Sequence, residues 1–221
     1  HVIMDKSHTN VAFVAKNGEV ILDAREDGTA ETERTREYLN LADIVAFAEH
    51  ANLEDVRGVL ERQIEYNCAI AEEGLKNDWG ARVGKLYLTS YDKEDVLICA
   101  KAAAAAGSDA RMSGCPMPVV IVSGSGNQGI TASAPIAVYA KEYDVDHDTM
   151  LRGLIIADLV SVYQKMGIGC LSAFCGAVSA GTGAAAGIVY MLGGDMEDIE
   201  HTIVNALGVV SGMVCDGAKP S

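Results

Sequence analysis

The sequence predicts a mainly α protein of the α+β class, a compact bundle of helices around central helices made of small residues, with a short N-terminal β-hairpin. Two short runs rich in Val, Ile and Phe flank the dipeptide Asn17-Gly18 near the start of the chain. Beyond residue 37, apolar residues recur mostly at the three- and four-residue spacing of helices. We therefore divide the chain into a hairpin with a charged connector (residues 1–36) and a helical domain (residues 37–221).

The hairpin is predicted from residues 10–15 and 19–23, because Asn-Gly accepts the positive φ angles of a tight two-residue turn. Residues 25–36 form a Thr- and Glu-rich connector that we expect to be exposed. Apolar spacing and capping residues then predict helices over 41–50, 54–74, 90–106, 147–165 and 196–215.

Two of these helices have recognisable start or stop signals. Ser90 is predicted to cap the third helix, and Gly107 to begin the segment that stops it. Asp195, with Asp198 three residues later, resembles a capping pattern for the last helix, and Gly193-Gly194 ends the helix before it.

Two stretches without any charge, residues 112–140 and 166–194, are both longer than a membrane span. The first contains three prolines and two side-chain amides, and the second is rich in Gly, Ala and Ser rather than in Leu and Ile. We therefore expect the second stretch to be a central helix that neighbours approach closely through its small residues, and we expect no membrane partner.

The composition limits the partners and the compartment. Of the 221 residues, 49% are hydrophobic and 22% charged, which is typical of a globular protein. The formal net charge of −14 disfavours nucleic acids and anionic membranes as partners, although a local loop can still bind a small anion. The N-terminus has no signal-peptide pattern, and six cysteines without framework spacing suggest reduced thiols in the cytoplasm.

A glycine-rich loop is the first candidate site. It contains Ser123, Gly124, Ser125, Gly126, Asn127 and Gln128, follows the strand-like residues 119–122 and precedes a predicted helix. Exposed backbone N–H groups and a helix start can hold a carboxylate or phosphate, and the two amide side chains add donors. The loop matches neither the P-loop nor the dinucleotide fingerprint, and a tight connector without a ligand remains the alternative.

The second candidate site is a pair of cysteines, Cys175 and Cys215, in nearly uncharged sequence rich in small residues. Thiolates are strong ligands for iron and zinc, and we interpret the pair as part of an inorganic cofactor site. The alternative is that each is a buried small hydrophobe. That alternative suits Cys68 and Cys99, whereas Cys115 in its loop stays open.

Four segments occur in an order that resembles one family. They are residues 110–115, the Ser-Gly-Ser-Gly-Asn-Gln-Gly segment from Ser123, residues 171–187 around Cys175, and residues 211–218 around Cys215. This order is similar to that of the L-cysteine desulfidase family, which is related to the α chain of iron–sulfur L-serine dehydratase. The resemblance is strong from residue 109 to the end and looser before it.

The resemblance implies an amino acid lyase that converts L-cysteine to pyruvate, ammonia and sulfide with a [4Fe–4S] cluster. It assigns cluster ligation to Cys175 and Cys215 and contact with the amino acid substrate to the loop at Ser123–Gln128. Three thiolates would leave one iron open as a Lewis acid for the substrate carboxylate or leaving group. The sequence does not identify the base that removes the α-proton.

The chain departs from the family pattern by lacking an N-terminal Gly-Cys-Thr-Glu-Pro-like segment and a further C-terminal cysteine. It resembles a fragment, and we expect it to fold without holding an intact cluster. L-Serine with the same cluster is the first alternative substrate, and a non-catalytic thiol-rich metal-binding module is the second alternative function. The sequence leaves the oligomeric state open, with a homo-oligomer among the options.

Overall fold

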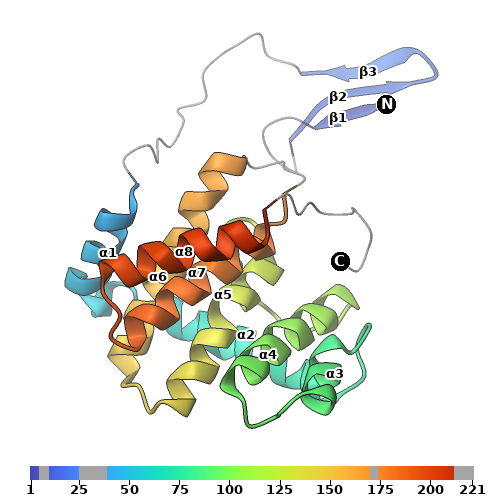
Figure 1. The fold of residues 1–221 in the computed structure, drawn as a ribbon. Coiled ribbons are helices and arrows are strands. Elements are labelled where there is room, and N and C mark those ends of the chain that lie inside the picture. The colour runs from blue at the N-terminus through green and yellow to red at the C-terminus, as the bar shows by residue number, and fades with distance from the viewer. Residues whose placement is uncertain (5–9, 25–38, 170–173, 212–221) are drawn as a thin grey trace.

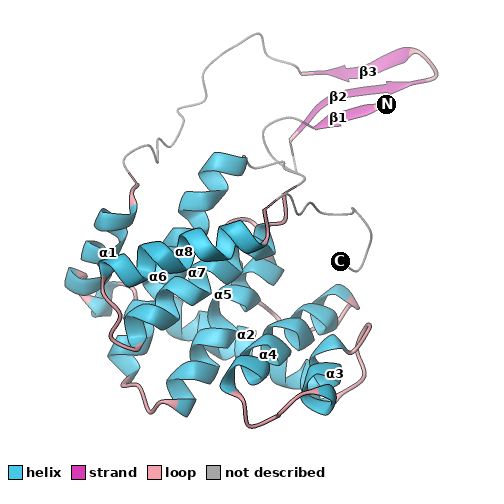
Figure 2. Cartoon of the chain, viewed as in Figure 1, coloured by secondary structure: helices cyan, strands magenta, loops and turns pink. Residues whose placement is uncertain are grey.

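The computed structural model describes residues 1–4, 10–24, 39–169 and 174–211, and it confirms the mainly α architecture with a small β element (Figures 1 and 2). Within these residues there are eight α-helices and one 3-10 turn. They are α1 Leu41–His50, η1 Leu53–Asp55, α2 Arg57–Lys76, α3 Val83–Ser90, α4 Val96–Met112, α5 Gly126–Glu142, α6 His147–Ile168, α7 Gly176–Met191 and α8 Met196–Val209.

The N-terminal sheet contains the predicted hairpin and one additional strand. Strands β2 (Val11–Lys16) and β3 (Glu19–Asp23) are antiparallel, and φ angles of 54° at Asn17 and 87° at Gly18 form the expected turn. Strand β1 (Val2–Met4) pairs with β2 and was not predicted, because three residues carry too little pattern. The predicted connector at 25–36 lies outside the described residues, and the domain boundary stays a prediction.

Two predictions around the third helix are wrong. Ser90 does not cap it but ends a separate short helix, α3, and α4 begins instead after Asp95, whose side chain accepts a hydrogen bond from the Leu97 N–H at 2.8 Å. Gly107 does not stop α4. A Cβ at Gly107 would lie 2.8 Å from Ile130, so glycine serves there for close packing of α4 on α5 rather than as a terminator.

The strand predicted at residues 119–122 is also not present as a strand. Only Val122 pairs, through a single bridge to Ser125. The segment is held by a side chain of α2 instead of a neighbouring strand, as described below.

The α6–α7 hairpin confirms the prediction of a central helix packed through small residues. At Gly183, a Cβ would collide with the Ala157 carbonyl of α6, and at Gly187 with the Gly153 carbonyl. The antiparallel backbones therefore approach as closely as glycine permits. None of the described helices combines the length and hydropathy needed to cross a membrane.

Helix α8 confirms the capping pattern read from the sequence. Asp195 accepts a hydrogen bond from the Asp198 N–H at 3.0 Å, and the Asp198 carboxylate accepts one from the Asp195 N–H at 3.1 Å. The described part of α8 ends at Val209, before the predicted end at residue 215, and Cys215 lies outside the described residues.

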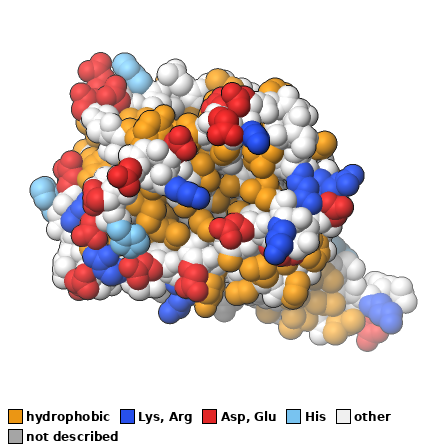
Figure 3. Space-filling model, turned by 90° about the horizontal axis from the view of Figure 1, so that it is seen from below, with side chains coloured by type: hydrophobic (Ala, Val, Ile, Leu, Met, Phe, Trp, Pro, Cys, Tyr) orange, Lys and Arg blue, Asp and Glu red, His pale blue; other side chains and the backbone are white. Residues whose placement is uncertain are grey.

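The surface reflects the acidic composition. On the face drawn in Figure 3, acidic side chains are spread over the helical body with lysines and arginines between them, and apolar side chains are exposed in the gaps.

Candidate active site at the start of helices α5 and α7

Helices α5 and α7 run parallel, so their N-termini lie at the same end of the bundle. Three glycines of α7 show this. From the first of them to the last, the nearest α5 residue lies progressively further along α5. The pairs are Gly176 with Gln128, Gly181 with Thr131, and Gly187 with Ile136. The glycine-rich loop, which begins α5, therefore lies next to the segment that begins α7.

The loop enters α5 through a tight turn. Ser123 and Gly124 have φ angles of 52° and 100°, and Val122 and Ser125 exchange two backbone hydrogen bonds of 3.2 and 3.3 Å across them. Ser125 is the N-cap, but among the described contacts its side chain makes no capping hydrogen bond. The first N–H groups of α5 therefore receive no hydrogen bond from the N-cap side chain, and anion binding by the loop stays a prediction.

The fully buried Asn67 of α2 holds the segment before the loop. Its side chain accepts a hydrogen bond from the Val120 N–H at 2.9 Å and donates to the Val120 carbonyl at 3.1 Å. It also donates to Ser133 Oγ at 3.1 Å, and that hydroxyl donates to the Gly129 carbonyl at 2.8 Å. One amide therefore fixes both the segment entering the loop and the first turn of α5.

Arg111 brings a positive charge to the same place from the end of α4. Its Nη1 donates to Asn127 Oδ1 at 3.1 Å, and its side chain occupies the space that a Cβ at Gly126 would need. A guanidinium beside an uncapped helix start reinforces the preference of that position for negative charge.

Cys175 lies at the adjoining helix start. It is the half-buried N-cap of α7, and the described residues supply no side-chain cap to this helix either. The Gln128 amide occupies the space that a Cβ at Gly176 would need. The structure thus places Cys175 next to the predicted loop, because the following residue, Gly176, lies against the Gln128 side chain.

Cys215 lies outside the described residues, and the last described residues before it are those at the end of α8. Val209 and Val210, at the end of α8, line a groove together with Val178 near the start of α7. Cys215 follows Ser211 by four residues, a span of at most about 14 Å. The chain therefore leaves the described structure at the end of the bundle that carries Cys175.

Buried polar groups without partners mark this end of the bundle. Within the described structure, Ser123 Oγ, Gln128 Oε1 and both amide atoms of Gln164 are buried and make no hydrogen bond. Gln128 is only 7% exposed. Such groups are rare in native proteins and cost free energy, which makes these residues candidates for contact with a ligand.

Sequence reasoning missed Gln164, which belongs to this cluster by its position on α6. Ala157 and Ser161 of α6 contact Gly183 of α7, so Gln164, three residues after Ser161, lies on the same face at the level of the first turn of α7. One signal was available: Gln164 continues the apolar stripe of Ala157 and Val160 at helical spacing, where an amide is out of place. We call Arg111, Ser123, Gln128, Gln164 and Cys175 the helix-start site.

Other cysteines lie elsewhere. Burial, with the Glu72 carboxylate, raises the pKa of the Cys68 thiol to about 11, which suits a packing residue. The Cys99 thiol donates to the Lys93 carbonyl at 3.1 Å. Cys115 packs against the apolar cluster of α2, α4 and α5, and its N–H donates to the Ala110 carbonyl at 3.0 Å. In the part of the chain that the structure describes, no three His, Cys, Asp or Glu side chains gather into a metal site.

The chain matches a known protein family. The family model for the serine dehydratase alpha chain matches residues 14–221. The chain belongs to this family. The match includes both candidate sites, so the helix-start site is part of a fold shared with lyase-like enzymes.

This family member is similar to two UPF0597 proteins. It is 50% identical over 215 residues to a UPF0597 protein of Desulfitobacterium hafniense (97% of this chain, 50% of the relative). It is 51% identical over 216 residues to a UPF0597 protein of Lachnoclostridium phytofermentans (98% and 52%). The chain thus spans about half the length of these relatives. No solved structure matches it.

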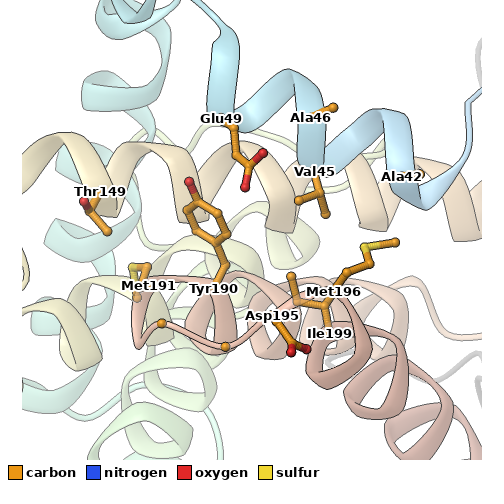
Figure 4. Close-up of a pocket in the computed structure, with 12 residues that line it drawn as sticks. Ala42, Val45, Ala46, Glu49, Thr149, Tyr190, Met191, Asp195, Met196 and Ile199 are labelled. Atoms are coloured by element: carbon orange, nitrogen blue, oxygen red, sulfur yellow. The ribbon is translucent and has the colours of Figure 1, made fainter.

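The family member also has a cavity of about 640 Å³ at the opposite end of α7, between α1, α6, α7 and α8 (Figure 4). Glu49 of α1 and Tyr190 of α7 point toward each other across it. Burial, followed by the Glu49 carboxylate, raises the pKa of the Tyr190 hydroxyl, and Arg152 opposes this effect. The cavity contains no thiol, and the α8 start on its rim is closed by its own capping box. The cavity therefore has neither the thiol nor the uncapped helix start that the helix-start site contains.

Proposed function

We propose that this chain is the core of an iron–sulfur amino acid lyase that eliminates the β-substituent of L-cysteine to give pyruvate, ammonia and sulfide. The observation that carries the proposal is the meeting of two uncapped helix starts, one bearing the glycine-rich loop and the other bearing Cys175. L-Serine is the alternative substrate of the same site, because the family is named for serine dehydratase.

The substrate carboxylate would bind at the loop. The free N–H groups at the start of α5 and the Arg111 guanidinium supply donors of the right charge, and the residues from Ser123 to Gln128 surround this position. Because Asn67 fixes Val120 and the first turn of α5, these donors are held in place before the substrate arrives.

A [4Fe–4S] cluster would be held by Cys175 and Cys215 with further ligands. The chemistry of the position fits, since Cys175 is a half-buried thiol at a helix start that favours negative charge, and the chain leading to Cys215 departs nearby. When bound, such a cluster supplies a Lewis-acidic iron for the leaving group or the carboxylate. The role of the described residues is to orient the amino acid beside that position, with its carboxylate toward α5.

Cysteine substitutions test the cluster assignment in the anaerobically reconstituted full-length polypeptide. Cys175→Ser and Cys215→Ser should each lower bound iron and reduce sulfide release from L-cysteine by about 100-fold or more, because a lost ligand removes the cluster. Cys68→Ala, at a thiol away from the site, should keep both. Unchanged iron and activity in the two serine variants would instead support a thiol-rich module without a catalytic role.

Substrate choice needs a separate measurement. Sulfide release from L-cysteine and ammonia release from L-serine, compared at equal concentration with the reconstituted protein, distinguish the two lyases. We expect a higher kcat/KM for L-cysteine, and a higher value for L-serine would assign the alternative.

A further inference from the structure

We propose that Gln128 and Gln164 bind the α-ammonium group of the substrate through their side-chain oxygens, and that Gln164 thereby makes the site specific for amino acids over simple carboxylic acids. This inference rests on the proposed function, since it assigns a second half to the same substrate site.

The positions of the two amides support this assignment. Gln128 of α5 lies against Gly176, and Gln164 of α6 lies at the level of the same turn of α7 by the register of the α6–α7 pair. The short connection between α5 and α6 makes these helices antiparallel neighbours, so the end of α6 lies near the start of α5. Two buried amides from different helices therefore face the start of α7.

The chemistry of the unpaired atoms gives the ligand class. Gln128 Oε1 and Gln164 Oε1 are acceptors without a donor among the described residues, and an ammonium group offers three donors without an acceptor. The donors of this site are the N–H groups at the start of α5 and the Arg111 guanidinium, and they favour a negatively charged group. A ligand that satisfies both sets carries a carboxylate and an ammonium group on neighbouring atoms.

Neutral amides suit this role better than a carboxylate would. A buried Asp or Glu in the same position would pair with Arg111 and compete with the substrate carboxylate. An amide oxygen accepts from the ammonium group without neutralising the guanidinium. The helix-start site accordingly contains two glutamines and no acidic side chain.

Gln63 is a control for Gln164, because substitutions at the two positions distinguish an effect on binding from an effect on folding. Gln63 of α2 is 2% exposed, and its Nε2 donates to Asp158 Oδ1 at 2.9 Å. The Gln63 side chain and the amide atoms of the half-buried Gln164 are both shielded from solvent, but Gln63 makes a hydrogen bond and the Gln164 amide makes none among the described residues. Replacement by Met keeps the side-chain volume roughly constant and removes the amide from either position.

The experiment measures calorimetric binding of L-alanine and of propionate, which have no β-leaving group and differ in the ammonium group. The unsubstituted full-length protein should bind L-alanine at least about tenfold more tightly than propionate. Gln164→Met should remove most of this preference with a Tm that is unchanged or higher, since an unpaired buried amide is lost. Gln63→Met should lower the Tm and keep the preference.

The outcomes separate this inference from the proposed function. A lower Tm with an intact preference in Gln164→Met would overturn it and make Gln164 a structural residue. Equal binding of the two probes by the unsubstituted protein would overturn it even if sulfide release is found. A preference that depends on Gln164 in a protein without lyase activity would support it and refute the proposed function.

Discussion

The buried polar residues of this protein form two groups that differ in one respect. Along α2, Gln63 and Asn67 make side-chain hydrogen bonds, the first with Asp158 and the second with Val120 and Ser133. At the helix-start site, Gln128 and Gln164 retain buried atoms without partners in the described structure. Both groups lie in the same bundle and are made of the same chemical type.

The difference separates stability from function. A paired buried amide contributes to folding and fixes the backbone around it, whereas an unpaired one lowers stability and gains a partner only when a ligand binds. Folding requirements account for the hydrogen bonds of the α2 group, but they do not account for the unpaired amides of the helix-start site. Substitutions in the two groups should therefore have opposite effects on stability.

The largest effect is expected at Asn67. Asn67→Leu removes the hydrogen bonds to Val120 and Ser133 and deprives the Val120 N–H and carbonyl of their Asn67 partner, which should lower the free energy of unfolding by about 3 kcal/mol. Urea denaturation measures this change. Asn77→Leu is the control, because Asn77 bonds Glu73 at the surface, and it should cost no more than about 0.5 kcal/mol. Equal costs at the two positions would remove the distinction on which the comparison rests.

Asp158 should make stability depend on pH. Burial raises the pKa of this carboxyl from 3.8 to about 7, and the hydrogen bond from Gln63 only partly opposes this. Between these values the folded state binds a proton that the unfolded state has lost, so stability decreases as pH rises. The loss should be about 2 kcal/mol between pH 5 and pH 7.

Asp158→Asn checks the origin of this slope. The amide keeps the acceptor for Gln63 and cannot ionise, so the denaturation midpoint of the variant should change less between pH 5 and pH 7 than that of the parent. A slope that persists unchanged in the variant would assign it to other groups.

The smallest effect on folding, and a selective one on binding, is expected at Gly176. A Cβ there would push against the Gln128 amide, the flexible end of a side chain, so Gly176→Ala should displace the amide at little cost in stability. Binding of L-alanine should weaken by about tenfold with a Tm within about 2 °C of the parent. In Gly181→Ala the new Cβ would lie 3.8 Å from Thr131, so both quantities should be unchanged. Weakened binding in both variants would indicate a general disturbance of α7.

The sequence predicted the elements that depend on neighbouring residues. Asn17-Gly18 requires only its own φ angles, and the Asp195–Asp198 capping box requires only one helical turn. It failed where the reason lies in another element. Gly107 lies inside α4 at a point where Ile130 leaves no room for a side chain, and residues 119–122 are held through Val120 by Asn67 of α2 instead of by a neighbouring strand.

The candidate site was predicted in its parts but not in its arrangement. The glycine-rich loop and Cys175 were identified from the residues around them, the family resemblance added cluster ligation by Cys175, and the structure places the loop and Cys175 at neighbouring helix starts. The parallel pairing of α5 and α7 depends on contacts between residues 48 positions apart, such as Gln128 and Gly176, and no local pattern encodes it. Gln164 was missed because a single polar residue at the end of an apolar helix is usually solvated.

The parallel arrangement of α5 and α7 has a consequence for the order of folding. The turn that follows α5 reverses the chain into α6, and only the return through α7 brings the second helix start beside the first. Early local hairpins of the nascent polypeptide, such as α5 with α6, therefore contain no complete pocket. If the helix-start site binds the proposed substrate, affinity should therefore emerge only when the last central helix has docked.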